Sequence, residues 1–156
     1  MNKECQKLHE ILTKRRFTLA TAESCTGGLL GSLLTSTPGS SKYFKLGVIA
    51  YSNKAKQILL KLPGSLIKTK GAVSREVAAK MAQNVKRLAG TDIGVGITGI
   101  AGPSGGTTQK PVGTVYIAAA LKNKTICMKS QFKGGRDKIR KLSALTALKL
   151  IAETLS

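Results

Sequence analysis

The sequence predicts an α/β fold: a single three-layer domain in which a mixed, mostly parallel sheet is covered by helices on both faces. Strand-like apolar runs alternate with helical segments in the earlier part of the chain, a pattern typical of such folds. Two strand-like runs joined by a short turn come late in the chain and add a hairpin to the sheet. The chain has 156 residues, 42% of them hydrophobic, which fits one domain over residues 1–156.

The earlier part of the chain predicts alternating helices and strands. Leu8, Ile11 and Leu12 recur at helical spacing and indicate an amphipathic helix. A polar turn that contains glycines then separates a short strand from an apolar helix, which ends at Pro38-Gly39. The predicted ranges are a helix over about 3–15, a strand over 17–22, a helix over 29–36, a strand over 45–51 and a helix over about 54–60.

The later part begins after a Gly/Pro turn. Ser74 is the expected N-cap of a helix that ends at Gly90, because a serine hydroxyl accepts a hydrogen bond from the first turn and Glu76 complements the helix dipole. Asp137 is expected to help start the last helix for the same electrostatic reason. The predicted ranges are a helix over 75–89, a buried strand over 92–98, strands over 114–121 and 125–132, and a helix from about 136 to 155.

The net charge is strongly positive: 26 Lys and Arg residues stand against 7 Asp and Glu, giving +19 at pH 7. Such a charge favours polyanions or anionic small molecules as partners. Aromatic residues make up 4% of the chain, so a solvated basic surface is favoured over a nucleic-acid groove. Lys and Arg are absent from residues 17–41 and 88–109, the two stretches that hold the glycine-rich loops.

The supply of catalytic side chains is narrow. His9 is the single histidine, and with so few acids this argues against a Ser/His/Asp triad, a zinc HExxH site or a carboxylate metal cage. We therefore expect no metal and no cofactor. Cys5, Cys25 and Cys127 form no close pair and are expected to be reduced thiols. With no apolar run of about 18 residues to span a bilayer, the sequence predicts a cytoplasmic protein without membrane contact.

Two glycine-containing loops are candidate anion sites. The turn over 23–28 places glycines before a helix, where backbone N–H groups can bind an anion, although N-capping by Ser24 or Thr26 explains the same pattern and is favoured in isolation. Residues 98–103 follow a central strand, the usual ligand position in open α/β sheets. Residues 94–99 match GxGxxG, but the helix and the acid that a dinucleotide site needs are missing, which disfavours a Rossmann site.

Three further side chains are candidates for catalysis or ligand binding because of their positions. Tyr51 ends a strand, and Lys56 could turn back over that strand end, where burial and positive surroundings would lower its pKa and let it serve a serine nucleophile. Spacing alone favours Lys56 as a solvated surface residue. Arg136 could clamp an anionic ligand at the start of the last helix or lie exposed beside a capped helix. Cys25 is expected to be a small buried hydrophobic residue.

The motifs together resemble the CinA C-terminal domain family, whose characterised members are nicotinamide mononucleotide deamidases. They occur in order along most of the chain, and this order makes the resemblance specific. The motifs are TAESCTGG (21–28), PGSS (38–41), YSN followed by AK (51–56), GAVS (71–74), TGIAGP with GG (98–106), KPVGTV (110–115) and GGRD (134–137). The chain departs from the family pattern at Ser104, where members often carry an acid, and at GGRD, where a GDR-type sequence is more usual.

The resemblance implies a metal-independent serine amidohydrolase that converts nicotinamide mononucleotide to nicotinate mononucleotide and ammonia in pyridine-nucleotide (NAD) recycling. By the family pattern, Ser41 is the nucleophile and Tyr51 and Lys56 relay protons, with the division of roles between these two, and between Ser24 and Ser41, left open. The residues implied in substrate binding are Ser24, Thr26, Gly27, Gly28, Thr98, Gly99, Ala101, Gly102 and Arg136.

The sequence also allows a different function and a different substrate. The charge, together with the family's association with competence and DNA damage, allows a non-enzymatic protein that binds nucleic acid or another partner. Under the amidase reading, nucleic acid would bind only weakly and without specificity through the basic surface, and another phosphorylated amide could be the substrate. The family resemblance also implies a homodimer.

Overall fold

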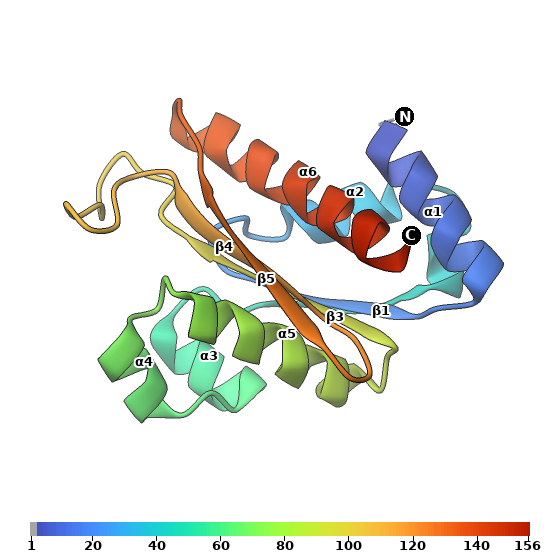
Figure 1. The fold of residues 1–156 in the computed structure, drawn as a ribbon, viewed down its shortest axis with the longest axis horizontal. Coiled ribbons are helices and arrows are strands. Elements are labelled where there is room, and N and C mark those ends of the chain that lie inside the picture. The colour runs from blue at the N-terminus through green and yellow to red at the C-terminus, as the bar shows by residue number, and fades with distance from the viewer. Residues whose placement is uncertain (1–2) are drawn as a thin grey trace.

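The structure, a computed structural model, describes residues 3–156 and has three layers, with a sheet between two groups of helices (Figure 1). In chain order its elements are α1 (Lys3–Arg15), β1 (Leu19–Glu23), α2 (Leu29–Thr35), the 3₁₀ helix η1 (Ser40–Lys42), β2 (Phe44–Ile49), α3 (Asn53–Leu60), α4 (Gly64–Lys70), α5 (Arg75–Ala89), β3 (Ile93–Gly99), β4 (Thr114–Ala120), β5 (Thr125–Gln131) and α6 (Arg136–Leu155). The first two residues of the predicted 1–156 domain lie outside the described residues.

The strands of the described chain form one sheet in the order β2-β1-β3-β4-β5. Strand β1 pairs in parallel with β2 and β3, whereas β4 pairs antiparallel with β3 and β5. The predicted mixed α/β sheet with helices on both faces is therefore confirmed. Strands β1, β2, β3 and β5 run in one direction and β4 runs against them, so the sheet is mixed and mostly parallel, as predicted.

The predicted elements match the structure to within a few residues, but the sequence analysis omitted α4 and the short 3₁₀ helix η1. Helix α4 was predicted as a Gly/Pro turn, but Pro63 caps this helix and Gly64 is its first residue. A proline is tolerated just before a helix because its missing N–H has no partner to lose there. The predicted cap of α5 is confirmed, since the Ser74 hydroxyl accepts from the Val77 N–H at 3.3 Å. No helix within residues 3–156 is both long and apolar enough to cross a bilayer.

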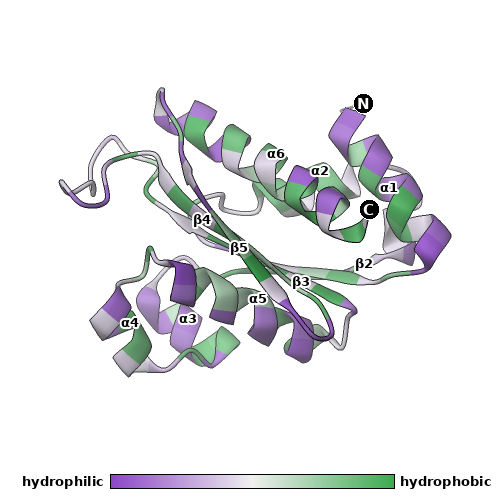
Figure 2. Ribbon diagram, in the orientation of Figure 1, coloured by the Kyte–Doolittle hydropathy of each residue, from purple (hydrophilic) through white to green (hydrophobic). Residues whose placement is uncertain are grey.

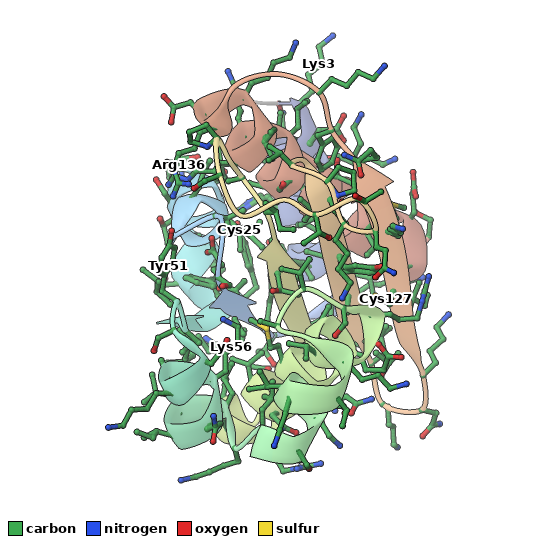
Figure 3. The ribbon with its side chains drawn as sticks, turned by 90° about the vertical axis from the view of Figure 1, so that its left-hand side faces the viewer. Lys3, Cys25, Tyr51, Lys56, Cys127 and Arg136 are labelled. Carbon is green, nitrogen blue, oxygen red and sulfur yellow. The ribbon has the colours of Figure 1, made fainter. Side chains whose placement is uncertain are left out.

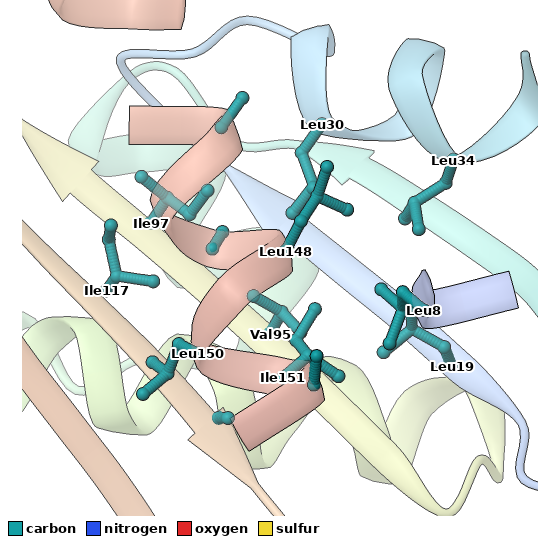
Figure 4. Close-up of a cluster of buried hydrophobic side chains, with 14 of the residues drawn as sticks. Leu8, Leu19, Leu30, Leu34, Val95, Ile97, Ile117, Leu148, Leu150 and Ile151 are labelled. Carbon is teal, nitrogen blue, oxygen red and sulfur yellow. The ribbon is translucent and has the colours of Figure 1, made fainter. Parts of the chain in front are cut away.

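The larger core lies between the sheet and the layer formed by α1, α2 and α6 (Figure 4). Its side chains come from alternate positions of the strands, such as Val95 and Ile97 in β3, and from the inner face of α6, such as Leu148 and Ile151. These four side chains are at most 1% exposed, and removal of such apolar area from water drives the layers together. Figure 2 shows hydrophobic and hydrophilic residues alternating along α1 and α6.

The other face of β3 carries glycines, and helix α5 packs directly against them. A Cβ at Gly94 would lie 2.0 Å from the Ala82 carbonyl oxygen, and one at Gly96 would lie 2.4 Å from the Ala78 carbonyl oxygen. The apparent GxGxxG pattern therefore serves close helix–sheet packing, in agreement with the interpretation that it is no dinucleotide site.

Gly96→Ala should destabilise the protein by about 3 kcal/mol, because the new methyl group must push α5 away from β3. Urea unfolding followed by circular dichroism measures this change. The matched control is Gly135→Ala, where the added Cβ meets no atom within 4 Å and φ is −73°. Gly135 is the N-cap of α6, where alanine is less favourable than glycine, so the control should cost less than about 1 kcal/mol. An equal loss in both variants would contradict the packing argument.

Candidate active site

The carboxyl ends of the three parallel strands meet at one edge of the sheet. Glu23 at the end of β1 pairs with Ile49 in β2 and with Ile97 in β3. The residues that follow these strands therefore lie together, as expected for the ligand edge of an α/β sheet. A cavity of about 280 Å³ opens here, lined by segments around Ser24, Tyr51–Lys56, Ala72–Val73, residues 98–105 and Arg136.

Lys56 and Ser24 form a buried pair at the inner end of this cavity. The Lys56 Nζ lies 3.0 Å from the Ser24 Oγ, and the two side chains belong to residues that are 2% and 8% exposed. The amine also donates to the Ala50 carbonyl at 2.9 Å and to the Tyr51 carbonyl at 3.2 Å. These contacts hold the amine between the end of β2 and the turn after β1.

Helix α3 explains how a lysine comes to be buried here. Ser52 caps the helix by accepting from the Ala55 N–H at 3.0 Å, which turns the chain back toward the sheet immediately after β2. Lys56 then lies one turn into the helix on its inner face, next to the carbonyls that it contacts. The prediction from spacing alone that Lys56 is a solvated surface residue is therefore wrong.

Burial changes the acid–base properties of two groups in this cavity. The pKa of Lys56 is lowered because its charged form loses hydration when buried, so a larger fraction of the amine is neutral. Burial raises the pKa of the Cys25 thiol to about 12, and the Glu23 carboxylate adds to this shift. Cys25 is 6% exposed, so it is a buried neutral thiol, as predicted, and it is a poor nucleophile compared with a thiolate.

The turn that carries Ser24 is held by the carboxylate of Glu23. This carboxylate accepts hydrogen bonds from the N–H groups of Gly28 at 3.0 Å, Leu30 at 3.1 Å and Gly31 at 2.8 Å. Glu23 is 2% exposed and lies at the N-terminus of α2, where the free N–H groups and the helix dipole favour an anion. The Glu23 carboxylate therefore occupies the helix N-terminus that the sequence analysis gave as a candidate site for a bound anion.

Arg136 connects three elements at the outer end of the cavity. It donates to the Gly102 carbonyl at 2.7 Å and to the Tyr51 hydroxyl at 2.9 Å, while its own position is the first residue of α6. Both Arg136 and Tyr51 are exposed, so the guanidinium has further donors open to solvent. Figure 3 shows Arg136, Tyr51, Cys25 and Lys56 along the same side of the molecule.

The structure brings most of the predicted site residues together. The cavity is lined by Ser24, Tyr51, Lys56, Thr98, Gly99, Ala101, Gly102 and Arg136. Residues 26–28 do not line it. Thr26 accepts a hydrogen bond from Arg140 through its carbonyl at 3.0 Å, and the Gly28 N–H is bonded to Glu23, so this turn supports the site from behind. Neither Ser24 nor Thr26 caps α2, whose N-cap is Gly28.

Ser41 is the exception among the predicted catalytic residues. It lies exposed in η1, before β2 begins, whereas Tyr51 and Lys56 follow the end of β2. A strand of this length separates the two ends of β2 by roughly 16 Å at about 3.3 Å per residue. The prediction that Tyr51 and Lys56 relay protons for Ser41 is therefore corrected, because proton transfer requires hydrogen-bond distance. The serine within that distance is Ser24.

Several residues of the site were not assigned a role from the sequence. Glu23 was quoted only as part of a motif, although a buried acid directly before a glycine turn and a helix is a signal for such an anchor. Ala72 and Val73 line the cavity because the Thr98 hydroxyl donates to the Ala72 carbonyl at 2.7 Å. Within residues 3–156, His, Cys, Asp and Glu side chains form no group of three or more that could hold a metal ion.

Glu23→Gln should lower the free energy of unfolding by about 2 kcal/mol, because hydrogen bonds to a charged acceptor are worth more and the new amide NH₂ would face backbone N–H donors. Thermal or urea unfolding at neutral pH measures this loss. Glu10→Gln on the exposed side of α1 is the matched control and should change stability by less than about 0.5 kcal/mol. Equal stability of the two variants would show that the carboxylate does not hold the turn.

Comparison with known proteins gives a consistent result. Residues 2–155 match the family model described as the CinA C-terminal domain. A relative from Caldanaerobacter subterraneus subsp. tengcongensis, named for competence and damage induction, is 51% identical over 94% of this chain, and a CinA-like protein of Desulfotalea psychrophila is 49% identical over 96% of it. The matched regions are 35% and 36% of those proteins, so the chain spans about a third of the length of these relatives.

Solved structures agree with these relatives. A competence damage-inducible protein A from Klebsiella pneumoniae superposes with a TM-score of 0.95 at 30% identity, covering 98% of this chain and 95% of that one. A competence/damage inducible protein from Agrobacterium tumefaciens gives a TM-score of 0.93 at 34% identity, covering 99% and 96%. With the family model matched along almost the whole sequence, this chain belongs to the CinA C-terminal domain family.

Proposed function

We propose that this protein is a serine amidohydrolase that converts nicotinamide mononucleotide to nicotinate mononucleotide and ammonia, as part of pyridine-nucleotide recycling. The observation that carries the proposal is the contact of 3.0 Å between the Ser24 Oγ and the Nζ of buried Lys56. A serine needs a base within hydrogen-bond distance to become a nucleophile, and a lysine of lowered pKa can be that base. The family resemblance supplies the substrate.

In the proposed reaction, neutral Lys56 takes the proton of Ser24 as the Ser24 Oγ attacks the carboxamide carbon. Backbone N–H groups that line the cavity would stabilise the negative oxygen of the tetrahedral intermediate. The C–N bond then breaks, Lys56 returns the proton to the leaving nitrogen, and ammonia departs. Water attacks the resulting ester with Lys56 again as base, which releases the carboxylic acid and restores the Ser24 hydroxyl.

The charges of the cavity fit this substrate. Lys56 and Arg136 are the cationic side chains among the described residues that line it, and they occupy its inner and outer ends. Arg136 has open donors for a phosphate at the exposed end. A neutral Lys56 would not repel the positive pyridinium ring at the inner end. Tyr51, hydrogen-bonded to Arg136 at 2.9 Å, is therefore proposed to position the guanidinium and to border the substrate.

Purified protein should release ammonia from nicotinamide mononucleotide in the presence of a chelator, and Ser24→Ala should lower kcat by about 10³-fold or more. Ser41→Ala is the matched control because it removes a hydroxyl from the exposed η1 helix and should leave kcat within about twofold. Circular dichroism checks that both variants are folded. The nucleoside that lacks the phosphate should show a much lower kcat/KM if Arg136 binds the phosphate.

The contrary outcomes of this experiment are distinct. Loss of turnover in Ser41→Ala with retention in Ser24→Ala would reverse the assignment of the nucleophile. Absence of ammonia release by folded wild-type protein would overturn the proposed reaction. Equal kcat/KM for nucleotide and nucleoside would retain the amidohydrolase and remove the phosphate from its specificity.

The pH dependence of kcat/KM should reflect the lowered pKa of Lys56. The neutral amine is the active form, so kcat/KM should rise with pH and level off above the pKa of Lys56, with a midpoint below the ordinary value for lysine. Initial rates across a pH series measure this profile. Lys56→Arg should show no such rise, because a guanidinium stays protonated throughout the range. A rising limb that persists in Lys56→Arg would assign the titration to another group.

A further inference from the structure

A second cavity lies at the opposite end of the sheet from the candidate active site. It has a volume of about 570 Å³ and opens between the last turn of α5 and the turn that joins β4 to β5. Lys86 and Arg87 line it from α5, and Lys122 and Lys124 line it from the turn. The length of β3, at about 3.3 Å per residue, places this cavity roughly 20 Å from Ser24.

The cations that line this cavity outnumber the acids around it. Within residues 3–156, none of the four forms an ion pair with a carboxylate within 4 Å. Asp92 lines the adjoining cavity together with Lys86, and its Oδ2 accepts from the Thr18 N–H at 2.8 Å and the Thr18 hydroxyl at 2.7 Å. These hydrogen bonds, with a smaller contribution from the Lys86 charge, lower the pKa of Asp92, so this carboxylate offsets one of the four positive charges. The C-terminal dipole of α5 contributes about half a negative charge, which leaves a clear positive excess.

An apolar cavity adjoins the cationic one. It has a volume of about 430 Å³ and shares Lys86 and the β4–β5 turn with the first cavity. Phe17, Ile93 and Leu121 give it an apolar wall, and Phe17 and Leu121 are only partly covered by the core beneath them. Each of the two volumes lies within the range of about 300–1,000 Å³ that is usual for ligand pockets.

We propose that these adjoining cavities form a second ligand site for a compact anion that carries an apolar ring, of the class of a nucleoside diphosphate. The phosphates would lie among Lys86, Arg87, Lys122 and Lys124, and the ring would lie against Phe17 and Leu121. An inorganic anion would leave the apolar cavity empty. A nucleic-acid strand is less well matched, because successive bases need several aromatic side chains to stack on and Phe17 is the aromatic residue of these walls.

Calorimetric titration with ADP, adenosine and pyrophosphate at constant ionic strength tests the proposal. ADP should bind more tightly than either of its parts. The double variant Lys122→Gln with Lys124→Gln should raise the Kd for ADP by about tenfold or more, because each charge-assisted contact to phosphate contributes to affinity. Both lysines are exposed in a turn, so the variant should fold, and thermal unfolding checks this.

Two controls separate this site from the rest of the charged surface. Lys68→Gln with Lys141→Gln removes the same charge from exposed positions elsewhere and should leave the Kd within about twofold. Arg136→Gln removes the exposed cation of the candidate active site and should also leave ADP binding unchanged. ADP binding by Arg136→Gln would support the second site whether or not the protein hydrolyses nicotinamide mononucleotide.

Several results would overturn the proposal. Equal weakening in both double variants would show diffuse attraction by the net charge, and loss in Arg136→Gln alone would place ADP in the candidate active site. Pyrophosphate binding as tightly as ADP would remove the role of the apolar cavity. Tight binding of a single-stranded oligonucleotide, lost on changing Lys122 and Lys124 while ADP does not bind, would make this surface a nucleic-acid site. Absence of ADP binding by folded wild-type protein would also contradict it.

Discussion

The hydrogen bonds from the start of α2 to the carboxylate of Glu23 hold the turn on which the candidate active site depends. Glu23 is the last residue of β1, so the carboxylate links the sheet directly to the helix that follows it. Ser24 is the next residue, and its own N–H donates to the Ile97 carbonyl at 3.0 Å. The serine is thereby fixed from both sides. Its hydroxyl then faces the end of β2, where the chain turns into α3 and brings in Lys56.

The burial of Lys56 has a cost in stability that the chemical role we propose for it would explain. A charged amine loses hydration in the interior, and the three oxygen partners around its Nζ compensate only part of that loss. A methionine of similar length would fill the space without this penalty. A lysine at this position is consistent with its proposed role as a base next to Ser24, in a site whose rigid frame is supplied by β1, β2 and α3.

The sequence predicted the layers well because they depend on local patterns. Periodicity identified α1, and capping chemistry placed the start of α5 at Ser74, since each of these signals acts within one or two turns. The candidate site was harder, because it depends on which strand ends lie side by side. Lys56 is separated from Ser24 by an entire strand and its connections, and no spacing rule revealed that they meet. Ser41 was assigned to act with Lys56 from the family's motifs. The order of motifs along a chain does not show that these two residues lie at opposite ends of β2.

The change from parallel to antiparallel pairing at β3 determines how the wall of the site is built. Because β4 returns alongside β3, residues 101–112 form one loop that leaves and re-enters the sheet at a single place. Two hydrogen bonds close the base of this loop: the Ile100 N–H donates to the Thr114 carbonyl at 2.9 Å, and the Gly113 N–H donates to the Ile100 carbonyl at 2.7 Å. Most of this loop is exposed and lies outside the core. Insertions and deletions there would reshape the mouth of the cavity while the Ser24–Lys56 pair stays in place. Such an arrangement would let related proteins admit ligands of a different shape by changing the length of one loop.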